Sequence, residues 1–304
     1  MNRCFYCGGR LTGDERPEHV IPLAIGAVLE TLQVCDPCNT KAGREVEKPW
    51  LRDPHVHPLR VMHKIPNRRK NPVSPRQIIA KLDDGRTARV IDHGSHQEIQ
   101  PLPRTTVDEV AGRLRVEASP KDFATIAARL KKERPDLRWV FTRPGSGTVT
   151  ATATEEVSIE TWPRFASKVT LALMSLLVDD SWLETDTAKE LQTVLWSGAR
   201  QANAMDGLGW AWAAIPAVVN RATAPGNLLG GPEHLLCFEA DQRGAALCII
   251  VFGDLLYRVR LSGLKLPLDA PAWLLDPKAR TVVCLPWPLL HAGLELRRLQ
   301  KTVR

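Results

Sequence analysis

The chain has 304 residues, of which 44% are hydrophobic and 25% charged. These proportions are ordinary for a globular protein and exclude a chain that is disordered along its whole length. Lys and Arg number 41 against 34 Asp and Glu, so the formal net charge is +7, which is compatible with a nucleic-acid partner. No apolar run approaches the roughly 20 residues of a membrane-spanning helix, and the first residues lack an export signal. We therefore expect a cytoplasmic protein without a membrane partner.

Four of the seven cysteines form two close pairs near the start of the chain, Cys4 with Cys7 and Cys35 with Cys38. Two thiolates that are separated by two residues on a tight turn can reach the same metal ion. In a chain without an export signal, two such pairs are typical of a four-sulfur zinc site and not of disulfides. We therefore predict a structural Zn²⁺ ion held by all four sulfur atoms.

The segment between the two cysteine pairs is expected to form two strands joined by a turn. Residues 18–21 end in two β-branched side chains, which favour a strand. Gly26 allows a tight turn before the chain returns through residues 29–34. Pro37 suits the first position of a helix, so a helix is predicted to begin at the second cysteine pair, with Asn39 in its first turn.

These motifs, taken in order, resemble the HNH endonuclease family. The pattern is a CxxC pair, Glu18-His19 followed by Val-Ile-Pro, a glycine turn, and a second CxxC pair followed by Asn39. The similarity is to the zinc-stapled four-cysteine subgroup with the ββα-metal fold, and it covers about residues 1–50. It implies that the chain hydrolyses DNA phosphodiester bonds, with His19 as the general base that activates water. It also implies that Glu18 and Asn39 hold the catalytic cation.

The residue types at this site suit phosphodiester hydrolysis. A neutral imidazole accepts a proton near physiological pH. Carboxylate and amide oxygens favour a hard cation, so Mg²⁺ or Mn²⁺ is expected at Glu18 and Asn39. The middle Asn of the family pattern has no clear counterpart, and Glu30 or Thr31 stands near its place. This departure supports an alternative, a catalytically inactive zinc-stapled protein that binds nucleic acid or has a regulatory role.

Positive side chains accompany and follow the second cysteine pair. Lys41 and Arg44 lie on the expected helix, and Arg68, Arg69 and Lys70 lie in a stretch without Asp or Glu. Such side chains bind phosphates without reading sequence, so these five predict a contact with double-stranded DNA. A solvated linker accounts equally well for the stretch. By analogy with HNH proteins of restriction and phage-defence systems, a homo-oligomer or a defence-system partner protein is also expected.

The rest of the chain is expected to form a mixed α+β domain with antiparallel strands, whose role would be recognition, regulation or oligomerisation. We place it at 77–304, after the module at 1–58 and a basic linker at 59–76. Turn residues and hydrophobic periodicity predict its elements. These are a hairpin over 78–82 and 87–91, helices over about 120–134, 163–178 and 187–197, and strands over 149–159, 235–240, 245–252 and 255–261.

Overall fold

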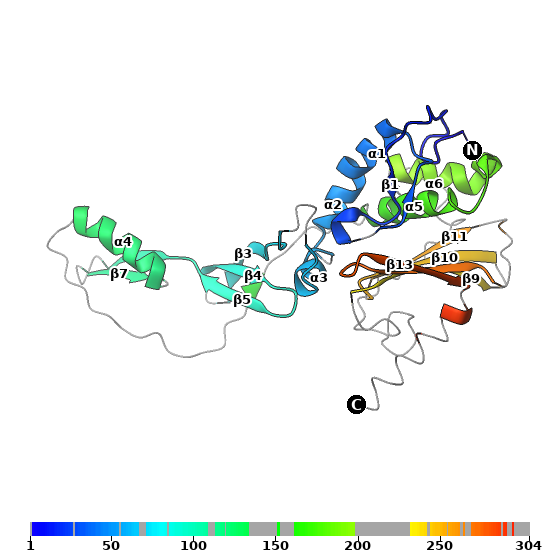
Figure 1. The fold of residues 1–304 in the computed structure, drawn as a ribbon. Helices are drawn as coiled ribbons and strands as arrows, with labels where there is room; N and C mark the ends of the chain where they lie inside the picture. The colour runs from blue at the N-terminus through cyan, green and yellow to red at the C-terminus, as the bar shows by residue number, and fades with distance from the viewer. Residues whose placement is uncertain are drawn as a thin grey trace. The chain divides into compact units, whose positions relative to one another are not determined.

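The structure is a computed structural model of the chain (Figure 1). It describes all residues except 1, 27, 55, 67–70, 84, 109–112, 119, 134–150, 153–160, 198–231, 242–243, 254, 262–263, 265–268, 287, 291–293 and 295–304. Arg68, Arg69 and Lys70, which are predicted to contact DNA, lie outside the described residues, as does most of the strand expected over 149–159. Within the described part of the chain, no helix has the length and apolar character needed to cross a membrane.

The chain divides into two compact units. Residues 1–73 and 157–304 form the first unit, and residues 74–156 form the second. The start of the second unit lies close to the boundary expected at residue 77. Residues 157–304, however, group with the N-terminal module and not with the hairpin region that precedes them. The mixture of helices with antiparallel sheets confirms the predicted α+β class.

The N-terminal module has the expected order of strand, turn, strand and helix. Strand β1 (Glu18–His19) pairs antiparallel with β2 (Glu30–Thr31), and the short helix η1 (Leu23–Ile25) lies between them. The helix after the second cysteine pair consists of three consecutive helical segments: α1 (Asp36–Ala42), η2 (Gly43–Glu47) and α2 (Lys48–Leu51). Pro37 lies in the first turn of α1, as predicted, because its missing N–H is not needed there.

The later part of the first unit places helices against one five-stranded sheet (Figure 1). All neighbouring strands are antiparallel, in the order β11-β10-β9-β12-β13. The strands are β9 (His234–Asp241), β10 (Gly244–Val251), β11 (Leu255–Leu261), β12 (Pro271–Asp276) and β13 (Thr281–Pro286). The helices of this part are α5 (Thr161–Met174), η3 (Asp180–Glu184) and α6 (Asp186–Ser197), and α3 (Val56–Met62) follows the N-terminal module earlier in the chain. Three of these strands and two helices, α5 and α6, confirm predicted elements, whereas β12, β13 and α3 were not predicted.

The N-terminal module and the later elements share one hydrophobic core. The ring of Trp50, at the end of the module, stacks on Phe165 of α5 with ring centroids 3.7 Å apart. The indole Nε1 of Trp50 donates a hydrogen bond to the hydroxyl of Tyr257 on β11, at 2.8 Å. Stacked aromatic rings and a satisfied buried N–H both stabilise such a contact. Through Trp50 the module therefore packs on both α5 and the sheet, which explains why residues 157–304 group with it.

The second unit contains the predicted hairpin. Strands β3 (Arg76–Leu82) and β4 (Thr87–Asp92) pair antiparallel in the four-stranded sheet β5-β4-β3-β8, which confirms that prediction. The other elements are β5 (Gln97–Pro101), β6 (Arg104–Asp108), β7 (Arg113–Glu117), α4 (Pro120–Glu133) and β8 (Ala151–Thr152). Strands β6 and β7 form a separate hairpin. The basic linker expected before this unit begins inside α3, so part of it is helical.

Candidate active site and zinc cluster

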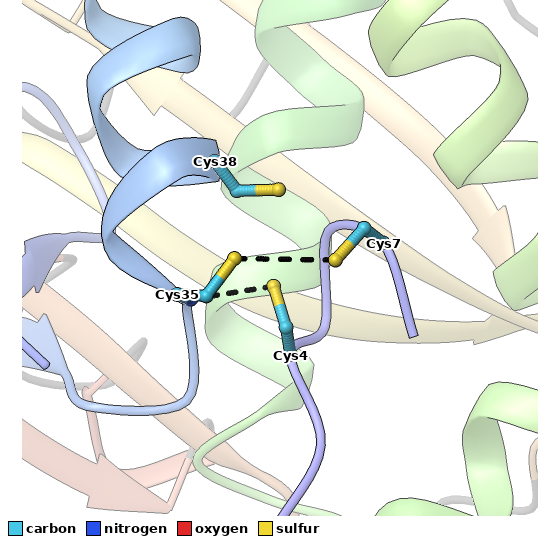
Figure 2. Close-up of side chains that lie close together, drawn as sticks. All are labelled: Cys4, Cys7, Cys35 and Cys38. Carbon is cyan, nitrogen blue, oxygen red and sulfur yellow. Dashed lines mark hydrogen bonds between the residues drawn. The ribbon is translucent and has the colours of Figure 1, made fainter. Parts of the chain in front are cut away.

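The four N-terminal cysteines form one sulfur cluster (Figure 2). Their sulfur atoms all lie within 4.8 Å of one another, and the Sγ atoms of Cys7 and Cys35 are 4.0 Å apart. Four sulfurs at about 2.3 Å from a zinc ion in tetrahedral geometry would be separated by a little under ~4 Å. The spacing therefore suits a structural zinc ion with no open coordination position, as the sequence predicts.

The local fold explains why the sulfur atoms meet. Cys4 and Cys7 lie on the turn before β1, whereas Cys35 precedes α1 and Cys38 lies in its first turn. The backbone N–H of Cys35 points at the sulfur of Cys4, at 3.4 Å. A hydrogen bond from the Cys38 thiol, together with backbone N–H groups, lowers the pKa of Cys4 to about 5, although burial opposes the shift. Cys4 is therefore a thiolate at neutral pH, which is the form that binds zinc.

The register of the β1–β2 hairpin sends its paired side chains to two different faces. Glu18 is opposite Thr31, and His19 is opposite Glu30. Because successive residues of a strand point to opposite faces, Glu18 and His19 point away from each other. The pair of Glu18 and Thr31 faces the protein interior, with exposures of 4% and 3%. The side chains of His19 and Glu30 are more exposed, at 22% and 45%.

The His19 imidazole faces a carboxylate on the neighbouring strand. Its Nδ1 atom lies 3.2 Å from Oε1 of Glu30, which is close enough for an ion pair. Among the described residues, Nδ1 has no hydrogen-bond partner. Burial lowers the pKa of His19, and the charge of Glu30 partly opposes that shift. His19 is therefore mostly neutral at physiological pH and can accept a proton. Glu30, which stands near the place of the missing middle Asn in the sequence, lies beside the predicted base.

Glu18 lies in a buried ionic cluster. Its Oε1 atom is 2.8 Å from Nζ of Lys168 and accepts a hydrogen bond from the hydroxyl of Tyr6, at 2.9 Å. Burial and the adjacent carboxylate raise the pKa of Tyr6 well above its usual value, so its hydroxyl keeps its proton and remains a donor. Burial alone would lower the pKa of Lys168, but the carboxylates of Glu18 and Glu47 outweigh it and raise the pKa. The Lys168 side chain is therefore charged and pairs with both carboxylates.

Asn39 lies in a different environment from Glu18. Its side chain is partly exposed, and its amide Nδ2 donates to the backbone carbonyls of Pro17 and Arg16, at 3.2 and 3.4 Å. A hydrated divalent cation needs several oxygen ligands around an open position. In this arrangement, the carboxylate of Glu18 is buried and its Oε1 atom already contacts Lys168 and Tyr6, so Glu18 does not fit the expected cation. Within the described residues, the four cysteines form the only metal-binding cluster of three or more His, Cys, Asp or Glu side chains.

Two of the predicted DNA-contacting residues already have partners on the protein. Nζ of Lys41 lies 4.3 Å from the ring centroid of Trp196 on α6, in a cation–π contact. Arg44 is largely exposed and pairs with the neighbouring Glu45, at 2.6 Å. Exposed pairs of this kind are weak, so Arg44 is free to exchange Glu45 for a phosphate.

Three residues of this ionic cluster do not stand out in the sequence as site residues: Tyr6, Glu47 and Lys168. One signal could have pointed to Lys168, because it is a charged residue on a helix whose pattern indicated burial, and buried lysines are paired. Nothing in the sequence indicates that its partners are Glu18 and Glu47, since more than 100 residues separate them from Lys168.

Comparison with known proteins gives one match. Residues 4–54 match the family described as HNH endonuclease. Neither the curated proteins nor the solved structures gave a match. The match covers the four cysteines, both strands of the hairpin and the helix that begins at Asp36. Residues 4–54 of this chain are therefore similar to the HNH endonuclease family and hold a four-cysteine cluster.

Proposed function

We propose that this protein is an endonuclease that hydrolyses phosphodiester bonds in DNA, with His19 as the general base. The observation that supports this most directly is the pair of His19 and Glu30 on the more exposed face of the hairpin, inside a module of a nuclease family. An imidazole that is mostly neutral at physiological pH and partly accessible has the two properties that a base for water requires.

The geometry of the pair supports a different part for each side chain. Nδ1 of His19 faces Glu30, so Nε2 is the nitrogen that accepts the proton from the attacking water. The imidazolium that forms carries a positive charge 3.2 Å from the carboxylate of Glu30. The negative charge of Glu30 stabilises the protonated base electrostatically. Glu30 thus stands beside the base, near the place of the missing middle Asn, and supports it by charge.

The family generally uses a divalent cation, which would neutralise charge on the scissile phosphate when bound. Because Glu18 is buried and already paired with Lys168, we assign parts in the reaction to His19 and Glu30 alone. For binding, we propose that Lys41, Arg44 and the stretch with Arg68, Arg69 and Lys70 contact the phosphates of double-stranded DNA. The proposed setting is a cytoplasmic restriction or phage-defence system, with a homo-oligomer or a defence-system partner, on the analogy given above.

A second candidate function is a zinc-stapled protein that binds nucleic acid without cutting it. The contact between Lys168 and Glu18 favours this candidate, because the carboxylate expected to hold the cation is already paired with a buried ammonium group. The two candidates agree on DNA binding and differ only in strand cleavage.

A plasmid-nicking assay with Mg²⁺, with Mn²⁺ and with EDTA separates the two functions. If the protein is a nuclease, His19→Ala should reduce the cleavage rate by about 100-fold or more, the usual effect of removing a general base. Zinc content and helical circular dichroism should not change. His96→Ala is a matched control, because His96 is an exposed histidine of the other unit.

The outcomes of this assay are distinct. Equal cleavage by wild type and His19→Ala would exclude His19 as the base. Salt-dependent DNA binding by a wild-type protein that cuts under none of the three conditions would favour the second function.

A further inference from the structure

The ammonium group of Lys168 is surrounded by oxygen atoms of the HNH module. It lies 2.8 Å from Oε1 of Glu18 and 2.9 Å from Oε1 of Glu47. It also donates hydrogen bonds to the backbone carbonyls of Val20, at 3.2 Å, and of His19. The lysine side chain has no solvent exposure, and that of Glu18 has 5%. Two carboxylates and two carbonyls therefore converge on one positive charge.

This set of oxygen atoms is of the kind that a hard cation binds. Divalent cations such as Mg²⁺ and Mn²⁺ take carboxylate and carbonyl oxygens. Here the carboxylate and carbonyl oxygens instead contact the ammonium group of Lys168, a residue of α5. The hydroxyl of Tyr6 adds a further donor to Glu18. A second positive ion at Glu18 would meet the charge of Lys168 in a buried environment, where like charges repel strongly.

We propose that Lys168 is a built-in cation that takes the place of a divalent metal ion beside Glu18. The folded protein then binds neither Mg²⁺ nor Mn²⁺ at Glu18, and this carboxylate holds the module on α5. The inference rests on the contacts of Lys168 and not on the proposed cleavage, so it applies equally to either candidate function.

The position of Lys168 on α5 explains why a metal ion would not displace it. The neighbouring residues Val169 and Leu171 are fully buried in the shared core, so the helix cannot move away without unpacking. Displacement of the ammonium group without such movement would leave a charged lysine buried without a partner, which is strongly unfavourable. Lys189, in contrast to the buried Lys168, pairs with Glu184 at the surface, where the two side chains are 56% and 62% exposed.

The test is a titration of the zinc-loaded full-length protein with Mn²⁺, followed by the loss of the electron paramagnetic resonance signal of free Mn²⁺. Wild type should show no saturable site up to millimolar Mn²⁺. Lys168→Met, which removes the charge and keeps most of the volume, should gain one site. Adding Glu18→Gln to Lys168→Met should remove that site. Lys189→Met is the matched control and should behave like wild type.

Two outcomes of the titration would overturn the proposal. One is a wild-type Mn²⁺ site that disappears in Glu18→Gln. The other is a folded Lys168→Met protein, with normal circular dichroism and zinc content, that gains no site.

A second measurement needs only the wild-type protein, and it decides the question if Lys168→Met does not fold. Reductive methylation followed by peptide mass spectrometry reports which lysines are accessible. Lys168 should stay unmodified with and without millimolar Mn²⁺, whereas Lys189 should be modified in both samples. Methylation of Lys168 that appears only with Mn²⁺ would show that the metal ion displaces it, and the proposal would be wrong. Neither measurement depends on DNA cleavage, so failure of this proposal is distinguishable from failure of the proposed nuclease function.

Discussion

Replacement of Gly26 by alanine tests whether the HNH module is packed against the C-terminal sheet. Gly26 ends η1 with φ +89° and ψ 6°, a backbone conformation that L-residues rarely adopt. A Cβ atom on Gly26 would lie 2.4 Å from the carbonyl oxygen and 2.5 Å from the Cβ of Pro277. Pro277 follows β12, so Gly26→Ala would force the module and this part of the sheet apart.

The expected cost has two parts. A positive φ costs a non-glycine residue about 1–2 kcal/mol, and a backbone shift forced by overpacking costs about 1–3 kcal/mol. We therefore expect Gly26→Ala to lower the free energy of unfolding by roughly 2–5 kcal/mol. Gly13 is a matched control, because its φ is +98° and no described atom outside its own neighbours lies within 4 Å of the position its Cβ would take. Gly13→Ala should cost only the first part, about 1–2 kcal/mol.

Urea denaturation at fixed zinc concentration, followed by tryptophan fluorescence, measures both variants. The entropy that alanine removes from the unfolded chain is the same at the two positions and cancels in the difference. The informative quantity is therefore the excess cost of Gly26→Ala over Gly13→Ala. If the two variants lose equal stability, the close approach to Pro277 does not exist in solution, and the module is not packed on the sheet as described.

Two further predictions concern the zinc cluster and the pH dependence of stability. Cys35→Ser should lose zinc and expose residues 4–54 to proteolysis, because a structural zinc site contributes directly to folding; full retention of zinc would contradict the four-sulfur site. Burial lowers the pKa of His234 to about 4 from 6.5, and neutral His234 bonds the carbonyl of Ile25 and the N–H of Phe252. The unfolded chain thus takes up the proton first, and stability should fall by about 3 kcal/mol in total as the pH drops from 6.5 to 4. In His234→Gln this pH-dependent loss should be absent from urea melts, and parallel curves for the two proteins would refute the assignment.

The features that could be predicted from the sequence are those that depend on short chain distances. Two cysteines separated by two residues share one turn, so each CxxC pair is positioned locally. The presence of two such pairs in a short stretch predicted that all four sulfurs bind one ion, and they form one cluster. Turn residues and alternation likewise placed the hairpin of β3 and β4 and the three strands β9, β10 and β11. The family match at residues 4–54 agrees with the resemblance over about the first 50 residues.

The division into units could not be predicted in the same way. Trp50 is 115 residues from Phe165 and 207 from Tyr257, yet the three rings form one contact. Hydrophobic periodicity indicates that a helix has a buried face, but it does not indicate which distant element covers that face. The sequence therefore indicated a separate N-terminal module, whereas the fold packs this module on residues 157–304.

The sequence by itself determined which chemical groups stand in the module: four thiols, a carboxylate, an imidazole and an amide. The tertiary structure decided what each group faces. Strand alternation turns Glu18 inward and His19 outward, and the register with β2 brings Glu30 beside the imidazole. Only the folded chain brings Lys168 of α5 to Glu18. A buried carboxylate needs a partner of opposite charge, and the residues near Glu18 in the sequence do not supply the one it has.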